Sequence, residues 1–307
     1  MWAHGGCFGS VGNTRHREAT MSHREGTLQR RGAIRPGLGW WILGGVLAIS
    51  APVVVRRKIR PRVRPRREVV HLRFDNGEGI ALAADLYASG HEDVVIVAHG
   101  FTSSKNAPEI VETCEHLARD YDVLALDLRG HGESGGRYDL GLDPVARDVA
   151  AAVRLARALR YRRVALMGFS LGAAACVMCA AEAGGADAVI SVACPAAPLS
   201  DSRWARFSVP LWRGWARLMG TRVSTGGTWS RFPADVVGQV SAPILIVHDG
   251  DDALIPKEIS EAFFAAAREP KDYLFLPNTP HAQVSREALN GIVGWLGQHL
   301  PQPAPRT

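Results

Sequence analysis

Cysteine is scarce in this sequence, and its scarcity argues against two classes of protein. The 307 residues include only five cysteines, too few and odd in number for a disulfide framework. Cys176 and Cys179 form a CxxC, but no further cysteine or histidine follows at the spacing of a zinc site. Their alanine-rich surroundings are typical of a helix and favour small apolar core residues. We therefore expect no metal site here.

A nucleic-acid recognition motif is also lacking. The net charge of +6 would suit a nucleic-acid partner, but most of the basic excess lies before residue 68. The rest of the chain is close to balanced, so the charge says little about the ligand of the main domain. We expect no nucleic-acid partner. The sequence shows no internal repeat either.

One long apolar run is present near the N-terminus. Residues 38–55 contain no charged side chain and are just long enough to cross a bilayer as a helix. Trp40 and Trp41 near one end suit a membrane interface. Residues 56–67 are strongly basic, and such a cluster resists translocation. We predict a single-pass membrane anchor at 38–55 and a juxtamembrane linker at 56–67, with the main domain on the cytoplasmic side.

Other interpretations of the N-terminal segment stay open. A cleaved signal peptide would export the protein, with residues 48–50 as a small-residue cleavage site. Residues 1–37 are rich in Gly, Arg and Ser without apolar periodicity, which predicts a disordered basic segment. The sequence does not decide whether Met21 is the true start.

From residue 68 onward the chain has the pattern of an α/β protein. Residues 68–74 and 80–87 are β-like and joined through Asn76-Gly77, a strong hairpin signal. Short apolar runs typical of buried parallel strands follow at 94–99, 123–128, 164–169, 188–193, 243–249 and 273–277. Helical patterns lie between them and at the end, at 108–120, 143–160, 171–183, 258–268 and 286–300. This predicts one domain over 68–307, with a mostly parallel sheet and helices on both faces.

The segment at about 195–240 interrupts this alternation. It shows no clear strand and is too long for a plain loop in a compact domain. Its tryptophans are Trp204, Trp212, Trp215 and Trp229. We predict a short helical lid, with a peripheral subdomain that packs its own aromatic side chains as the alternative.

The sharpest motif is the pentapeptide GFSLG, with Ser170 at its centre. It directly follows a predicted strand and opens a predicted helix, which is the setting of a nucleophile elbow. Gly168 and Gly172 flank the serine because bulkier residues would clash in so tight a turn. The helix N-terminus beneath the turn favours developing negative charge.

A serine hydroxyl needs an adjacent base to act as a nucleophile near neutral pH. In chain order, acidic residues follow the next-to-last strand and His281 follows the last. Both places lie at carboxyl ends of parallel strands, where open α/β sheets bind ligands. We expect His281 to exchange the proton of Ser170 and Asp252 to hold the imidazole.

Backbone N–H groups would bind the oxyanion. One is Leu171, directly after the nucleophile, and the other is expected in the loop after the 94–99 strand. Phe101 is the candidate in that loop. His99 precedes Ser170 in the chain, and we expect it to organise the loop rather than act as the base.

Several motifs in order resemble the α/β-hydrolase superfamily, over about residues 68–300. They are HGF at 99–101, DLRGHGES at 127–134, GFSLG at 168–172, HDGDDALIP at 248–256 and the late His281. The DLRGHGES stretch is similar to those of monoglyceride-lipase-like and serine-aminopeptidase-like members. The resemblance implies the α/β-hydrolase fold and a Ser-His-Asp triad.

The resemblance also bears on the choice of acid. In the pattern HGxxDxxxP, the acid lies four residues after the histidine and four before the proline. Both counts lead to Asp252, with Asp251 left as an alternative. The sequence departs from the pattern at Asp249, where glycine is usual, and at Pro280, where glycine commonly precedes the histidine.

These features predict a serine hydrolase that cleaves carboxylic esters through an acyl-enzyme, with no metal or cofactor. The tryptophan-rich segment and the predicted anchor favour small-molecule substrates with lipophilic acyl groups. Two alternatives stay open, because fold does not fix substrate. One is a peptidase or amidase of the serine aminopeptidase type, and the other is a non-catalytic, membrane-tethered binding protein.

Overall fold

The computed structural model describes residues 63–198, 213–217, 219–224, 227 and 230–300. They fall within one compact unit, Pro36–Thr307. The basic segment, the anchor at 38–55 and residues 56–62 of the linker lie outside the described residues, so these stay predictions. Within the described ranges, no helix is both long and apolar enough to span a membrane.

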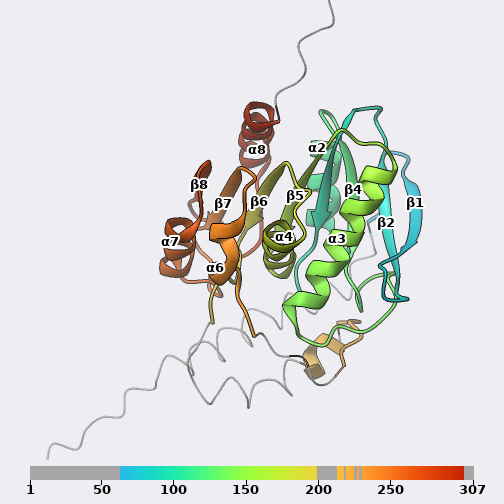
Figure 1. The fold of residues 1–307 in the computed structure, drawn as a ribbon, viewed down its shortest axis with the longest axis horizontal. Coiled ribbons are helices and arrows are strands. Elements are labelled where there is room, and N and C mark those ends of the chain that lie inside the picture. Colours follow the sequence, from blue (N-terminus) through green and yellow to red (C-terminus); the bar gives the residue numbers. More distant parts are fainter. Residues whose placement is uncertain (1–62, 199–212, 218, 225–226, 228–229, 301–307) are drawn as a thin grey trace, which may run out of the picture. The chain divides into compact units, whose positions relative to one another are not determined.

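An eight-stranded sheet forms the centre of the fold (Figure 1). Its spatial order is β1-β2-β4-β3-β5-β6-β7-β8. Strand β2 runs antiparallel to β1 and β4, and the other five neighbouring pairs are parallel. The strands are β1 (Val70–Asp75), β2 (Ala81–Tyr87), β3 (Asp93–Ala98), β4 (Asp122–Asp127), β5 (Arg163–Phe169), β6 (Ala188–Val192), β7 (Ile244–Asp249) and β8 (Lys271–Leu276). This confirms the predicted α/β architecture with a mostly parallel sheet.

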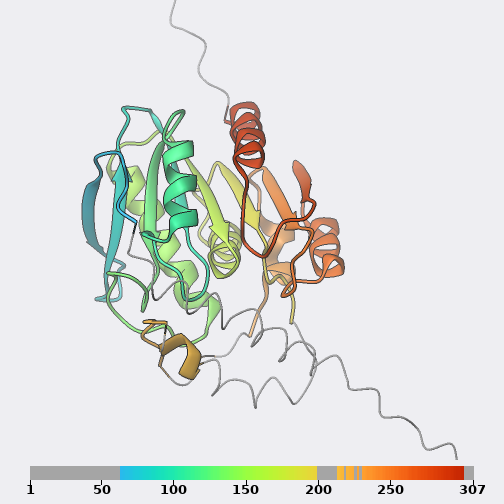
Figure 2. The ribbon, with the colours of Figure 1, turned by 180° about the vertical axis from the view of Figure 1, so that it is seen from behind.

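Helices cover both faces of the sheet. One face carries α3 (Leu142–Ala158), α4 (Leu171–Glu182), α6 (Pro233–Val236) and α7 (Lys257–Ala266), which lie in front in Figure 1. The other carries α2 (Pro108–Leu117) and α8 (Arg286–His299), which come to the front in Figure 2. A short 3-10 turn, Val237–Gln239, precedes β7.

The period-2 alternation of strand side chains divides the core into two layers. Ile96 and Leu166 belong to the cluster with α3 and α4. Val95 and Met167, next to them in β3 and β5, belong to the cluster with α2 and α8. Strands β3 to β7 are buried on both faces, which explains why they read as continuous apolar runs in the sequence.

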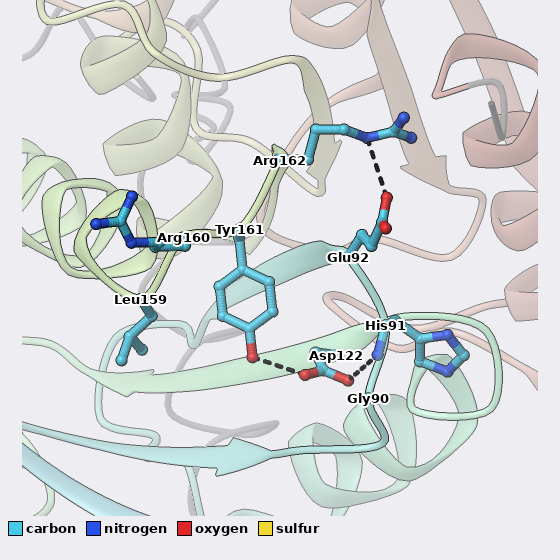
Figure 3. Close-up of a pocket in the computed structure, with 8 residues that line it drawn as sticks. All are labelled: Gly90, His91, Glu92, Asp122, Leu159, Arg160, Tyr161 and Arg162. Carbon is cyan, nitrogen blue, oxygen red and sulfur yellow. Dashed lines mark hydrogen bonds and ion pairs between the residues drawn. The ribbon is translucent and has the colours of Figure 1, made fainter.

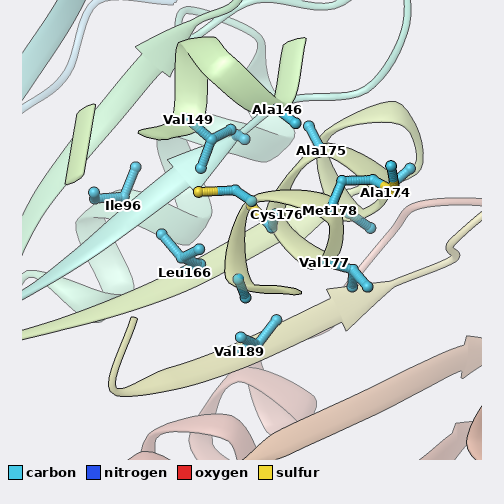
Figure 4. Close-up of a cluster of buried hydrophobic side chains, with 14 of the residues drawn as sticks. Ile96, Ala146, Val149, Leu166, Ala174, Ala175, Cys176, Val177, Met178 and Val189 are labelled. Carbon is cyan, nitrogen blue, oxygen red and sulfur yellow. The ribbon is translucent and has the colours of Figure 1, made fainter. Parts of the chain in front are cut away.

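Helix α4 is buried along most of its length between the sheet and α3 (Figure 4). Its small residues let it approach both neighbours closely. Cys176 and Cys179 are free thiols inside this contact. Burial raises the pKa of both thiols, that of Cys179 to about 12. They pack as small core side chains rather than as reactive groups.

The predicted lid falls largely outside the described residues. Between β6 and α6 the structure describes residues 193–198, 213–217, 219–224, 227 and 230–232, with a short helical stretch at 213–217. The Tyr138 N–H donates to Arg222 O, the Arg222 N–H donates to Gly130 O, and the Ser224 N–H donates to Tyr138 O. These backbone bonds tie this part of the segment to the loop after β4. The role as a lid stays a prediction.

Leu166 tests the core layer next to α4. It is fully buried, so Leu166→Ala is expected to lower the free energy of unfolding by about 2–5 kcal/mol in urea titrations. Leu159→Ala serves as a control, because Leu159 is 44% exposed and should change stability by less than about 0.5 kcal/mol. Equal small losses in both variants would contradict this view of the core.

Candidate active site

Ser170 occupies a tight turn between β5 and α4. Its φ of +50° and ψ of −112° are values that residues other than glycine rarely adopt. The turn is held by the Ser170 N–H, which donates to Val192 O at 2.9 Å, and by the Ala174 N–H, which donates to Ser170 O at 3.0 Å. Strained backbone of this kind persists only where its surroundings impose it, and it clusters at functional sites.

Two glycines make the turn possible. A Cβ on Gly168 would lie 2.3 Å from Gly172 O, and a Cβ on Gly172 would lie 2.2 Å from Ala98 O. Both distances are far below van der Waals contact, and the opposing atoms belong to backbone that cannot turn aside. Bulkier residues would thus clash at both positions, as the motif predicted, and the structure adds that the start of α4 packs directly on the end of β3.

His281 lies between Ser170 and Asp252. Its Nε2 is 3.0 Å from Ser170 Oγ, and its Nδ1 is 2.7 Å from Asp252 Oδ2. His281 comes from the loop between β8 and α8, and Asp252 from the turn after β7. The structure thus brings together three side chains that are far apart in the sequence.

The acid next to the histidine is Asp252 rather than Asp251. The Asp252 side chain is fully buried, and its Oδ1 accepts hydrogen bonds from the N–H groups of Leu254 and Ile255 at 2.8 and 2.9 Å. Asp251 is exposed. With one oxygen held by backbone, Asp252 presents the other to His281 in a fixed direction.

The loop after β3 lies against the serine. A Cβ on Gly100 would lie 3.5 Å from Ser170 Cβ, so the loop that carries Phe101 borders the nucleophile. Leu171 begins α4 and is adjacent to Ser170. His99 is fully buried, with Nδ1 2.8 Å from Gly100 O and Nε2 accepting from the Leu128 N–H at 3.2 Å. These bonds imply a proton on Nδ1 and give His99 the loop-organising role expected of it.

Asp127 joins this loop to the turn that follows β4. Its Oδ1 accepts from the Lys105 N–H at 2.7 Å, and its Oδ2 accepts from the Glu133 N–H at 2.8 Å. A Cβ on Gly132 would fall 2.1 Å from that Oδ2. Burial raises the pKa of Asp127, while the two backbone bonds act against that rise. The sequence singled out this motif as a family mark, but its role as a brace for the loop required the structure.

Aromatic rings gather around Phe101. Its ring centroid lies 5.8 Å from that of Tyr138, 5.9 Å from that of Trp215 and 6.2 Å from that of His131. Burial, followed by the proximity of His99, lowers the pKa of His131 to about 3, so its ring is neutral. Trp215 belongs to the predicted lid, whose other tryptophans lie outside the described residues. The loop that carries Phe101 is therefore packed into an aromatic cluster, in which Tyr138 and His131 are buried.

A separate pocket of about 570 Å³ lies at the amino ends of the central strands, whereas Ser170 lies at the carboxyl end of β5 (Figure 3). It is lined by residues that precede β3 and β5 and by Asp122, the first residue of β4. Asp122 accepts hydrogen bonds from Tyr161 Oη at 2.6 Å and from the N–H groups of Ser89 and His91 at 2.8 and 3.0 Å. Its carboxylate thus holds loops together at the amino ends of the strands, away from Ser170.

Comparison with known proteins agrees with this geometry. Residues 93–233 match the family model of the alpha/beta hydrolase fold. The strand order and the serine at the carboxyl end of β5 match the same fold. The chain has the α/β-hydrolase fold, and the family match over residues 93–233 supports its membership of the α/β-hydrolase superfamily.

Relatives of this α/β-hydrolase occur in several bacteria. It is 27% identical over 196 residues to the uncharacterized protein Rv2307c of Mycobacterium tuberculosis, which covers 63% of this chain and 64% of that protein. It is 30% identical over 175 residues to the uncharacterized protein YfhR of Salmonella typhimurium, and this match covers 53% of this chain and 56% of that protein. The matched regions therefore span less than two thirds of these relatives.

Solved structures share the fold at low sequence identity. The esterase Pf2001 of Pyrococcus furiosus superposes with a TM-score of 0.62 at 19% identity, covering 78% of this chain and 97% of that one. The esterase Est1E of Butyrivibrio proteoclasticus, solved with ferulic acid, superposes with a TM-score of 0.62 at 22% identity. The match covers 75% of this chain and 100% of that one. A monoacylglycerol lipase of Paleococcus ferrophilus superposes with a TM-score of 0.58 at 17% identity. The match covers 71% of this chain and 99% of that one.

The glycine contact beneath the elbow yields a stability prediction. Gly172→Ala is expected to lower the free energy of unfolding by about 3 kcal/mol or more, because the new Cβ meets the backbone of Ala98. The control is Gly294→Ala, since Gly294 is an exposed helical position with open space around it. That change should stabilise by up to about 1 kcal/mol. The free energy of unfolding of both variants is measured by urea denaturation. A Gly172→Ala variant as stable as the unaltered protein would contradict the close packing.

Proposed function

We propose that this α/β-hydrolase is a serine hydrolase that cleaves carboxylic esters through an acyl-enzyme. The proposal is carried by the chain of contacts from Ser170 Oγ to His281 Nε2 at 3.0 Å and from His281 Nδ1 to Asp252 Oδ2 at 2.7 Å. Both distances suit proton transfer and orientation of the imidazole. A nucleophile, a base and an orienting acid are thus in contact before any substrate binds.

In the proposed mechanism, Ser170 Oγ attacks the ester carbonyl carbon while His281 Nε2 takes its proton. The resulting tetrahedral oxyanion collapses and expels the alcohol, which receives that proton from His281. Water then attacks the acyl-enzyme with His281 as base, releasing the acid and restoring the serine. Asp252 stays ionised and stabilises the imidazolium in both steps.

Oxyanion binding is assigned to the backbone N–H groups of Leu171 and Phe101. Leu171 N–H is among the first N–H groups of α4, which have no partner within the helix. The loop carrying Phe101 lies against Ser170 and is braced by His99 and Asp127. Each such donor is worth about 3 kcal/mol in the transition state.

The substrate class follows from the surroundings of the serine. The loop that borders Ser170 carries Phe101, whose partly exposed ring lies 5.9 Å from the partly exposed ring of Trp215, and this apolar surface would suit an acyl or aromatic group. Two of the similar structures are called esterases and a third a monoacylglycerol lipase, which supports ester substrates. The anchor predicted at 38–55 would hold the site near lipid-borne esters.

Labelling with a fluorophosphonate probe tests the nucleophile. The folded protein should be labelled on Ser170, and Ser170→Ala should lose labelling and all but a residual fraction of esterase activity. Asp252→Asn should reduce kcat by about 10⁴-fold, because the wrong imidazole tautomer is then favoured. Asp251→Asn is the matched control and should leave kcat near that of the unaltered protein. An unlabelled serine in folded protein would reject the hydrolase proposal.

A substrate panel separates ester from peptide cleavage. We expect p-nitrophenyl esters to be cleaved, with kcat/KM rising with acyl chain length as more apolar surface is buried. Aminoacyl-anilides run beside them should be poor substrates. The reverse order of kcat/KM would favour the peptidase alternative.

A further inference from the structure

A second buried carboxyl group lies next to the histidine loop. Asp249 is the last residue of β7 and is fully buried. It occupies the position where the related motif has glycine. Its Oδ2 accepts a hydrogen bond of 2.6 Å from the backbone N–H of Ala282, the residue directly after His281.

The backbone after His281 needs such a tie. Ala282 has a φ of +57°, in the left-handed region that residues other than glycine seldom adopt. The backbone N–H of Gln283 also stabilises the Asp249 carboxylate. The side chain of Asp249 thus holds the backbone directly after His281, while Asp252 holds the His281 ring.

Building on the serine hydrolase function proposed above, we propose that Asp249 is a positioning residue for His281 and a second ionisable group of the site. Its carboxyl group keeps the histidine loop in place through the Ala282 N–H. Its negative charge, when present, favours the imidazolium that forms when Ser170 attacks.

The electrostatic surroundings make this group sensitive to pH. Burial raises the pKa of Asp249 to about 7, and the charge of Asp252 acts in the same direction, whereas the Ala282 N–H and His281 oppose it. Asp249 Oδ1 has no hydrogen-bond partner among the described residues. A proton can therefore sit on Oδ1 while Oδ2 still accepts from Ala282.

Asp252 and His281 are the described charged groups that bear on this carboxyl group. The neighbouring histidine in β7, His248, lies on the other face of the sheet, where its Nδ1 is 3.0 Å from Ser260 Oγ. Strand β6 carries no charged side chain, and the two charged residues of β8, Lys271 and Asp272, lie at its opposite end. The pH effect of Asp249 is thus directed at the triad.

Two substitutions separate positioning from charge. Asp249→Asn keeps an oxygen acceptor for Ala282 and removes the charge, whereas Asp249→Ala removes both. With a p-nitrophenyl ester, Asp249→Ala should lower kcat roughly tenfold or more with little change in KM, because His281 is misplaced. Asp249→Asn should keep kcat within about threefold at high pH. Its acid limb of kcat/KM should move to lower pH by roughly half to one unit, because a charge that favours protonated histidine is gone.

Asp251→Asn is the matched control, since Asp251 lies in the same turn but is exposed. It should move neither kcat nor the acid limb. An acid limb that does not shift in Asp249→Asn, or a full kcat in folded Asp249→Ala, would overturn the proposal. The Asn variant keeps the hydrogen bond and so remains informative if the Ala variant does not fold.

Unfolding measured against pH provides a readout that does not depend on catalysis. Between pH 3.8 and about 7, the native Asp249 retains a proton that the unfolded chain has released. Stability must therefore fall as pH rises through this window, and Asp249→Asn should lack that part of the fall. If the free energy of unfolding changed with pH in the same way in the unaltered protein and in Asp249→Asn, the proposed ionisation of Asp249 would be wrong. If Ser170→Ala instead kept full activity, the hydrolase proposal would fail while these two pH dependences still differed.

Discussion

The start of α4 packs on the end of β3 without space for a single methyl group, and the site depends on this contact. Gly172 meets the Ala98 backbone there, and Gly168 faces Gly172 across the turn. Because the helix enters so closely, Ser170 is forced into a positive φ at the edge of the sheet. The same contact sets Gly100 against the serine. One steric constraint thus places the nucleophile and its neighbouring loop together.

Most of the fold was predictable from the sequence because local pattern and tertiary environment agree. Strands β3 to β7 are buried on both faces, so they appear as uninterrupted apolar runs. Asn76-Gly77 marks the β1–β2 turn, where Gly77 has a φ of +91°. The spatial order of the strands is not written in such patterns. It depends on which strands pair after the chain folds, and only the structure gives it.

The site was predictable where residue type and chain order suffice, as for Ser170 and His281. The contributions of Asp249 and Asp127 were not, because each depends on which backbone N–H lies beside its carboxylate after folding. Both are buried carboxyl groups that secure loops, and neither touches Ser170 in the contacts described. In the sequence, Asp249 was only a departure from the HGxxDxxxP pattern, and Asp127 was only the first residue of the DLRGHGES motif.

The three side chains of the triad come from very different places along the chain. Ser170 lies near the middle, whereas Asp252 and His281 flank β8, the edge strand that is last in the sequence. Domains are synthesised from the N-terminus, so the serine and its elbow exist before the groups that would activate it. Under the proposed function, the growing chain carries an inert hydroxyl until β8 docks, and hydrolytic capacity arrives with completion of the sheet.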